Sequence, residues 1–340
     1  MRSGRGRSGT ARRVATAAAA VLLGAFAVGV LVDWVRPKPT HEASRDPAAS
    51  ATPTATPTPS GPSLAPLPQV TATLRPLPTP TPTRTASSAP AVQTLAGWPG
   101  PDNTGWQHTG VRLTPIGCTA GGELRLDKPG TVITGRDIPC SVYVTASNVT
   151  ILRSRISSGA DWAVRTDDSV TGFRIEDTEI AGQPGCQAAL TFAHWTAYRL
   201  NIHGCGDGVR AEEQTLLQDT WIHDFWNGYK NGQQIDTPHH DGVQDTGGSG
   251  LTIRHNRIDN PHDQTSCILI GGEFGSPSDI LIENNYLDGG NFTIYLDPKG
   301  SNRRIVDNTF TRNHVYGTSR LDGQYTWTGN HYTDGAAVVP

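Results

Sequence analysis

An internal repeat of short apolar segments is the feature that most limits how this chain can fold. Eight segments end in an apolar residue, at positions 156, 180, 202, 222, 258, 287, 310 and 332. The intervals between them are 24, 22, 20, 36, 29, 23 and 22 residues, a base period just above twenty with two long exceptions. Apolar and polar residues alternate inside the segments, so the repeat predicts a stacked solenoid of β-strands.

An asparagine stands two residues before the end of four successive segments, at Asn256, Asn285, Asn308 and Asn330. Stacking the segments would bring these side chains into one column at the turn between two strands. There each amide could bond the rungs above and below it and tolerate a left-handed backbone. The column predicts one turn geometry that is repeated along the solenoid.

The repeat resembles that of the secreted right-handed parallel β-helix proteins of the pectate-lyase-like superfamily, in an N-terminally anchored, actinobacterial form. The resemblance covers residues 116–335 and depends on the rung length, the Val/Ile/Leu triplets and the asparagine column. It implies an all-β fold, a right-handed parallel β-helix with a rung for each of the eight segments. It also implies atypical capping segments at residues 97–122 and after Asp334.

The five cysteines can be assigned with this architecture in mind. Cys186 and Cys205 are 19 residues apart, close to one coil, so they could stack in neighbouring rungs. We expect that disulfide and a second one, Cys118–Cys140, which would staple the N-terminal cap. Cys267 is left as a buried thiol, and the sequence does not reveal its role.

Charge and proline content divide the chain. Residues 1–96 hold 10 Lys+Arg and 3 Asp+Glu, whereas residues 97–340 hold 18 and 28, and 14 of the 25 prolines lie at 37–90. We therefore expect a basic cytoplasmic tail (1–13), an apolar segment (14–32), a Pro/Thr/Ala-rich linker (33–96) and a β-helix domain (97–340). The acidic domain argues against a nucleic-acid partner, and we expect a monomer.

The apolar segment at 14–32 has the length of a membrane-spanning helix, and five arginines precede it. These features favour an uncleaved anchor with its N-terminus inside, although Ala25-Phe26-Ala27 resembles a signal-peptide cleavage site. In either case the rest of the chain is exported, anchored to the cell membrane or secreted. The linker would then carry the domain through the cell wall.

The two long intervals point to a site. They insert residues 224–240 before a strand at Val243 and lengthen the next rung at 260–266 and 271–279. In the superfamily that the repeat resembles, the site lies on the outer face of that sheet, between long turns. Asp207 and Asp241 begin the same Asp-Gly-Val motif in successive rungs, about 4.8 Å apart. Carboxylates that close need a cation or a proton between them, although Asp-Gly also simply closes tight turns.

The candidate residues follow from this placement. The candidate catalytic residues are Asp241, Asp207, Asp245, His240 and Arg210. Arg210 could hold a uronate carboxylate, because its guanidinium group matches one bidentately. The candidate substrate-binding residues are Gln244, Lys230, Trp226, Tyr229, Tyr295, Glu273, Asp297 and Lys299.

We expect an exported enzyme that processes an acidic or complex polysaccharide of the cell wall or outside it, by one of two reactions. In a lyase, Ca²⁺ on Asp207, Asp241 and Asp245 would acidify a uronate proton, with Arg210 or Lys230 as the binding or basic group. In a glycosidase, Asp241 would share the acid, base and nucleophile roles with Asp207, Asp245 or Glu273. The alternatives are a non-catalytic wall-binding or adhesive solenoid and a uronan C5-epimerase, whose motif residues 260–265 partly resemble.

Overall fold

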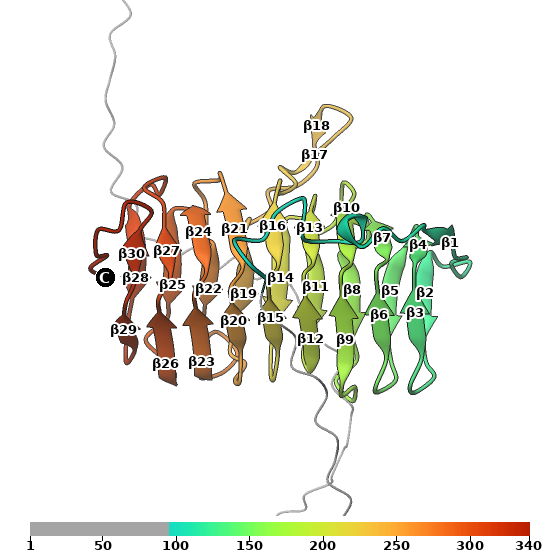
Figure 1. The fold of residues 1–340 in the computed structure, drawn as a ribbon, viewed down its shortest axis with the longest axis horizontal. Coiled ribbons are helices and arrows are strands. Elements are labelled where there is room, and N and C mark those ends of the chain that lie inside the picture. The colour runs from blue at the N-terminus through green and yellow to red at the C-terminus, as the bar shows by residue number, and fades with distance from the viewer. Residues whose placement is uncertain (1–94) are drawn as a thin grey trace, which may run out of the picture. The chain divides into compact units, whose positions relative to one another are not determined.

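The computed structural model describes residues 95–340, which wind into a right-handed parallel β-helix (Figure 1). The predicted tail (1–13), the apolar segment (14–32) and nearly all of the linker (33–96) lie outside the described residues. Within residues 95–340, no helix is long and apolar enough to cross a membrane.

Three parallel sheets form the walls of the helix, and each rung contributes one strand to each wall. The first sheet consists of β2 (Glu123–Leu126), β5 (Ser141–Val144), β8 (Trp162–Thr166), β11 (Ala188–Phe192), β14 (Asp207–Ala211), β19 (Val243–Asp245), β22 (Ile268–Ile270), β25 (Phe292–Leu296) and β28 (Gly317–Leu321). The second sheet consists of β3 (Val132–Thr134), β6 (Thr150–Leu152), β9 (Phe173–Glu176), β12 (Trp195–Tyr198), β15 (Leu216–Gln218), β20 (Thr252–Arg254), β23 (Ser278–Glu283), β26 (Ser301–Val306) and β29 (Thr326–Thr328).

The third sheet consists of β1 (Thr114–Pro115), β4 (Arg136–Ile138), β7 (Arg155–Ser158), β10 (Glu179–Gly182), β13 (Asn201–His203), β16 (Trp221–His223), β21 (Arg257–Asn260), β24 (Tyr286–Gly289), β27 (Thr309–Phe310) and β30 (His331–Tyr332). Its register pairs all eight segment ends predicted from the repeat, from Ile156 to Tyr332. The predicted rungs are therefore confirmed, including the two long ones.

The first sheet also has the predicted orientation. Val164, Val209, Val243 and Ile294 are completely buried and lie in one column of the register. Their neighbours in the sequence, such as Gln244, are partly exposed. Because strand side chains alternate between faces, an apolar column inside fixes a polar column outside.

The asparagine column is confirmed, with one correction. The backbone N–H and the side-chain NH₂ of Asn256 both donate to Asn285 Oδ1, at 2.9 and 3.0 Å, and the same pattern links Asn285 to Asn308 and Asn308 to Asn330. The left-handed residue is not the asparagine but the residue before it, for example His255 at φ 50°. The asparagine keeps an ordinary backbone because its side chain must point along the solenoid axis to bond the next rung.

The predicted C-terminal cap is present. Val338 is 5% exposed and belongs to the hydrophobic core, while its carbonyl accepts the Trp327 indole N–H at 2.8 Å. This apolar side chain covers the last rung, which has no neighbour beyond it.

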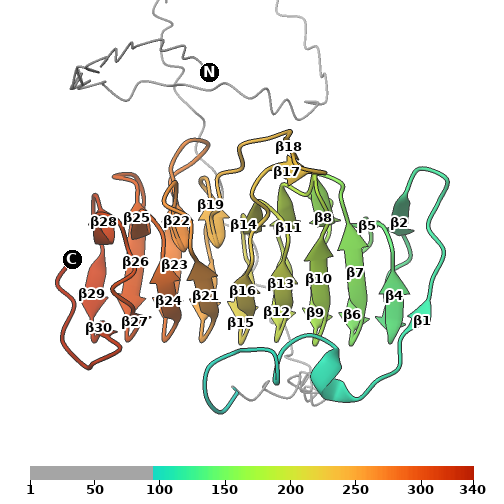
Figure 2. The same ribbon diagram turned by 90° about the horizontal axis from the view of Figure 1, so that it is seen from above.

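The predicted N-terminal cap is only partly correct. Residues 95–110, with the short 3₁₀ helix η1 (Gln107–Thr109), run along the flank of the solenoid rather than over its end (Figure 2). Trp98 stacks on His255 at 5.2 Å, and Trp106 donates to Glu179 at 2.7 Å, several rungs away. Polar residues at the turn between the second and third sheets bind this segment, residues 95–110, which we call the strap. The solenoid itself begins with β1 and β2.

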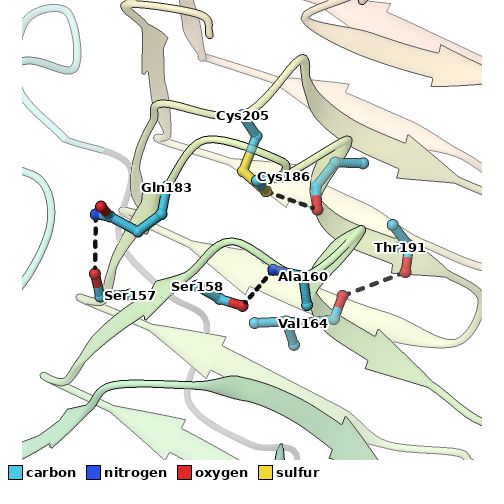
Figure 3. Close-up of a disulfide and its surroundings, with 9 residues drawn as sticks. Ser157, Ser158, Ala160, Val164, Gln183, Cys186, Thr191 and Cys205 are labelled. Atoms are coloured by element: carbon cyan, nitrogen blue, oxygen red, sulfur yellow. Dashed lines mark hydrogen bonds between the residues drawn. A yellow bond between two sulfur atoms is a disulfide. The ribbon is translucent and has the colours of Figure 1, made fainter. Parts of the chain in front are cut away.

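Both predicted disulfides are present. Cys186 and Cys205 join two neighbouring rungs at the corner that leads into β11 and β14 (Figure 3). Cys118 and Cys140 join the first rungs at the N-terminal end. Cys267 is a buried free thiol, as expected, and burial raises its pKa well above the ordinary value, so it stays protonated.

The longest insertion, residues 224–240, lies between β16 and β19. Its middle forms a small antiparallel hairpin of β17 (Tyr229–Lys230) and β18 (Gln233–Gln234), which stands out from the solenoid in Figure 1. The start of the insertion is bound to the solenoid, because the Trp226 N–H donates to the Cys205 carbonyl at 2.8 Å. The insertion therefore lies at the corner between the third and the first sheet.

Candidate functional site

Asp207 and Asp241 occupy this corner in neighbouring rungs, as predicted. The Asp241 N–H donates to Asp207 Oδ1 at 2.9 Å, and Ser266 donates from its N–H and its hydroxyl to Asp241 Oδ1, at 3.1 and 2.7 Å. Both carboxyl groups are completely buried. Each therefore connects its rung to the next, which is a role the sequence did not predict.

Asp207 is ion-paired with Arg210. The guanidinium group of Arg210 contacts Asp207 Oδ2 through Nε and Nη2, both at 2.7 Å. The Asp207 charge is thereby balanced inside the protein, and Arg210 is engaged by that carboxylate. The predicted role of Arg210 in holding a uronate would require it to bind two carboxylates at once.

Asp241 is the most perturbed carboxyl group of the corner. Complete burial, followed by the nearby Asp207 charge, raises its pKa to about 8. The nearby Thr265 hydroxyl acts in the opposite direction and lowers that pKa. This hydroxyl donates its hydrogen bond to the His239 carbonyl, and Asp241 Oδ2 has no hydrogen-bond partner. At neutral pH Asp241 is therefore mainly a neutral carboxylic acid, next to the carboxyl group that pairs with Arg210.

His240 covers the corner from the end of the insertion. Its Nε2 donates to the Trp226 carbonyl at 3.0 Å, and its ring stacks on His262 with the centroids 3.7 Å apart. Burial, followed by His262, lowers the pKa of His240 to about 4, so the imidazole is neutral at pH 7. Phe225 meets both rings edge-on, and the buried Nδ1 of His240 has no hydrogen-bond partner.

Asp245 does not share this site. It lies four residues beyond Asp241 along an extended strand, roughly 13 Å away. Its Oδ1 accepts the N–H groups of Gly247 and Gly248 at 3.0 and 2.7 Å, and burial raises its pKa to about 6. Within residues 95–340 no three His, Cys, Asp or Glu residues are close enough to hold a metal ion. The predicted Ca²⁺ at Asp207, Asp241 and Asp245 thus stays a prediction, without a preformed cluster.

Buried polar atoms without a hydrogen-bond partner concentrate in the predicted motif. Seven occur among the side chains of the described residues, and three of them belong to residues 239–245: His240 Nδ1, Asp241 Oδ2 and Asp245 Oδ2. Such atoms are rare in folded proteins because leaving them unpaired costs free energy.

The remaining predicted residues fall into three places. Glu273, Asp297 and Lys299 follow β22 and β25 at the opposite corner of the first sheet, where Lys299 Nζ donates to the Gly272 carbonyl at 2.6 Å. Gln244 and Tyr295 lie on the outer face between the two corners. Trp226, Tyr229 and Lys230 belong to the insertion, where the Trp226 indole donates to the Tyr229 carbonyl at 2.8 Å. Tyr229 and Lys230 are exposed.

The sequence did not predict a pocket on the third sheet. It has a volume of about 430 Å³ and is lined in part by Trp221, His223, Asp259 and Asp288. These residues face outward from β16, β21 and β24, in rungs that the register places side by side. The alternation of strand residues indicates this outward face, because Trp221, His223 and Asp259 alternate with the buried Ile222 and Ile258.

The fold and the corner define a class, a β-helix with a buried carboxyl pair beneath an inserted loop. A family model described as "right handed beta helix region" matches residues 140–338, more than half of the chain, so the protein belongs to that family. Its members include polysaccharide-processing enzymes and non-catalytic proteins. Neither a curated protein nor a solved structure matches the chain significantly.

Proposed function

We propose that this protein is an exported polysaccharide-processing enzyme and that its reaction centre is the corner formed by Asp207, Arg210 and Asp241. The observation that carries the proposal is that His240 Nδ1 and Asp241 Oδ2, both buried at this corner, have no hydrogen-bond partner. Hydrogen bonds between rungs stabilise the solenoid, whereas a buried acid without a partner does not. A free-energy cost of this kind at one motif is typical of a functional site.

Glycoside hydrolysis fits the corner better than elimination does. Asp241, with a pKa of about 8, is a proton donor at neutral pH, and the ion-paired Asp207 is an ionised carboxylate beside it. A lyase would need a free base, whereas Arg210 is engaged by Asp207 and Lys230 lies in the exposed strand β17. Asp241 would protonate the glycosidic oxygen while Asp207 attacks the anomeric carbon and the glycosidic bond breaks. A water molecule, giving its proton to Asp241, would then release the sugar from Asp207.

The spacing of the rungs supports a retaining reaction. Neighbouring parallel strands lie about 4.8 Å apart, close to the ~5–5.5 Å between the two carboxyl groups of retaining glycosidases. An inverting enzyme needs a wider gap for a water molecule. We therefore expect the product to keep the anomeric configuration of the substrate.

Substrate access requires the insertion to open, because both carboxyl groups are completely buried. The insertion is held at its end by Asn260, which donates to the His240 carbonyl at 2.6 Å, and by the bond of His240 to Trp226. Opening would join the corner to the outer face with Gln244 and Tyr295. This requirement makes the loop, and not the sheet, the gate to the reaction.

A complex glycan of low charge suits this face better than a strongly acidic one, since Glu273 and Asp297 border it and Arg210 is already paired. Export is supported by the sequence of residues 14–32 and by the two disulfides, which persist in oxidising compartments.

One observation favours the second candidate, a non-catalytic glycan-binding solenoid. Asp207 and Asp241 each accept a backbone N–H from the next rung, which would be sufficient reason for an acidic side chain at these positions. That role is structural, and it would survive replacement of the carboxyl group by an amide.

Asp241→Asn separates the two functions. The full chain is incubated with neutral and uronate-rich polysaccharides, with and without calcium, and new reducing ends and unsaturated uronates are measured together. We expect reducing ends alone, and a loss of about 10²–10⁴-fold in kcat for Asp241→Asn, because the general acid is removed. Asp322→Asn, an exposed acid of the last rungs, is the matched control and should behave as the wild type.

Three results would count against the proposal. Unsaturated products would indicate a lyase, and full activity of Asp241→Asn would remove this residue from the chemistry. Binding of a glycan without turnover, equal in the wild type and in Asp241→Asn, would favour the non-catalytic solenoid.

A further inference from the structure

The pocket on the third sheet is separate from the corner described above. It opens on the outer face of β16, β21 and β24, whereas the carboxyl pair faces the first sheet. The turn that begins at Asn260 and Pro261 forms one wall of the pocket, and the same turn carries His262 toward the corner. The pocket is therefore a neighbour of the proposed reaction centre but does not contain it.

Its size and its aromatic wall suit a sugar ring. A volume of about 430 Å³ is within the range of ligand sites, roughly 300–1,000 Å³. Trp221 stands at its side in a fixed position: its ring stacks on His223 at 3.5 Å, and its indole N–H donates to Asp259 Oδ2 at 2.8 Å. His223 covers one face of the indole, and the remaining part of the ring offers apolar surface next to polar groups, which suits an amphipathic ring.

The polar groups of the pocket are acidic. Asp224, Asp259 and Asp288 line it, and no lysine or arginine is among the described residues that do so. Asp259 is balanced by Arg257, whose Nε lies 2.9 Å from Oδ2. Burial lowers the pKa of His223, which disfavours a positive charge on this ring.

Asp288 carries a negative charge that no lysine or arginine lining the pocket balances. Its Oδ1 accepts hydrogen bonds from Thr311 at 2.6 Å and Asn313 at 2.8 Å, which orient the carboxylate without neutralising it. Asp224 adds a second negative charge at the rim, with its side chain 86% exposed. The pocket therefore attracts a cation and repels a uronate.

A metal ion does not fit these acids. In the described part of the chain, no three acidic, His or Cys side chains approach one another closely enough to bind one. The carboxylates are instead spread around a space of sugar size. The charge thus calls for an extended organic cation that offers several hydrogen-bond donors.

We infer that this pocket binds a sugar unit that carries a free amino group, with the ring beside Trp221 and the ammonium group at Asp288. The N-acetylated form of the same sugar has the same ring but no charge, so the pocket would distinguish the two. The site needs no chemistry at Asp241, and it would hold a glycan to the outside of the third sheet.

Calorimetric titration of the full chain tests this inference with three oligosaccharides of equal length: glucosamine tetramer, N-acetylglucosamine tetramer and galacturonate tetramer. The pH is kept low enough for the amine to be protonated. We expect only the glucosamine tetramer to bind tightly, with an affinity that falls as salt is raised. Asp288→Asn should weaken it about tenfold or more, because a charge-assisted bond becomes a neutral one.

Two controls make the result specific. Asp322→Asn removes one acid outside the pocket and should bind as the wild type does. Asp241→Asn should also bind normally, which keeps failure of this site distinguishable from failure of the proposed hydrolase. Thermal unfolding of Asp288→Asn confirms that it folds before its affinity is compared.

The inference is overturned if Asp288→Asn binds as well as the wild type, or if the N-acetylated tetramer binds equally. Tighter binding of the galacturonate tetramer, or no binding of any of the three, has the same meaning. Loss of binding in Asp241→Asn would assign the ligand to the corner instead of the pocket.

Discussion

A column of four asparagines and a stack of two aspartates both bond neighbouring rungs of this β-helix, but with different chemistry. At the turn between the second and third sheets, Asn256 donates its N–H to the side-chain oxygen of Asn285 in the next rung. At the corner between the third and first sheets, Asp241 donates its N–H to the side-chain oxygen of Asp207 in the rung before. Both satisfy buried backbone donors where the strands end.

The difference is what remains after those bonds are made. An amide has a donor and an acceptor, so Asn285 also donates Nδ2 to Asn308 Oδ1 at 2.9 Å and to the Ile253 carbonyl at 2.9 Å. A carboxyl group has a second oxygen instead, and in Asp241 that oxygen has no partner. The asparagine column is explained by architecture alone, whereas the proposed hydrolase would use the acid of the other corner as a proton donor.

The largest stability effect is expected in the asparagine column. Asn285→Ala removes the acceptor of two Asn256 donors and leaves them buried and unpaired, which should lower the free energy of unfolding by about 3–5 kcal/mol. Urea unfolding measures it. Asn284→Gly is the neighbouring control, since this residue is exposed and has φ 51°, where glycine is comfortable. A decrease of less than about 1 kcal/mol in the free energy of unfolding would show that the column does not stabilise the fold appreciably.

The second effect is a pH dependence in the aspartate stack. The pKa of Asp241 is raised to about 8 in the folded chain but has its ordinary value near 4 when unfolded. Between these values the folded state holds the proton more tightly, so this carboxyl group destabilises the fold progressively as the pH rises, by up to about 1.4 kcal/mol per unit. Below pH 4 the penalty is absent.

Asp241→Asn should remove that dependence. Urea unfolding of the wild type and the variant at pH 5 and pH 7 gives the difference directly, and the variant should gain stability relative to the wild type by at most about 3 kcal/mol over that interval. Parallel curves for the two proteins would show that Asp241 does not hold a proton in the folded state.

The smallest effect is expected where hydroxyl groups replace the amides. In the N-terminal rungs the same turn is bridged by single bonds, such as Ser154 N–H to Thr178 Oγ1 at 3.3 Å. Thr178→Val keeps the shape and removes one acceptor, so it should cost about 1 kcal/mol, clearly less than Asn285→Ala. Thr150→Val, on the outer face of β6, is its control and should be neutral in the same unfolding measurement. Equal losses at Thr178 and Asn285 would contradict the comparison between amide and hydroxyl columns.

Much of the scaffold was predictable. The repeat predicted eight of the ten described strands of the third sheet, the orientation of four rungs of the first sheet and both disulfides, since strand side chains alternate and a rung has about twenty residues. The left-handed residue was misplaced by one, because turn geometry depends on where the side chain must reach. The N-terminal strap was predicted as an end cap, because nothing in Trp98 or Trp106 says that their partners are His255 and Glu179.

The sequence predicted where the site lies in the fold, but not the burial and the partners of its side chains. Residues 239–245 were singled out, and Asp207 and Asp241 do meet. Their complete burial was not predictable, because it depends on how the insertion folds over the corner, and the sequence argument did not foresee the pairing of Asp207 with Arg210. The distance of Asp245, in contrast, follows from the rise of an extended strand.

The sequence by itself determined the periodic part of this protein: its rungs, its inner and outer faces and its polar columns. It could do so because these features repeat locally, every two residues along a strand and every rung along the solenoid. Tertiary structure alone decided the proton on Asp241, the strap on the flank and the acidic pocket of the third sheet. These depend on desolvation and on contacts between distant segments, for which no local pattern of residues exists.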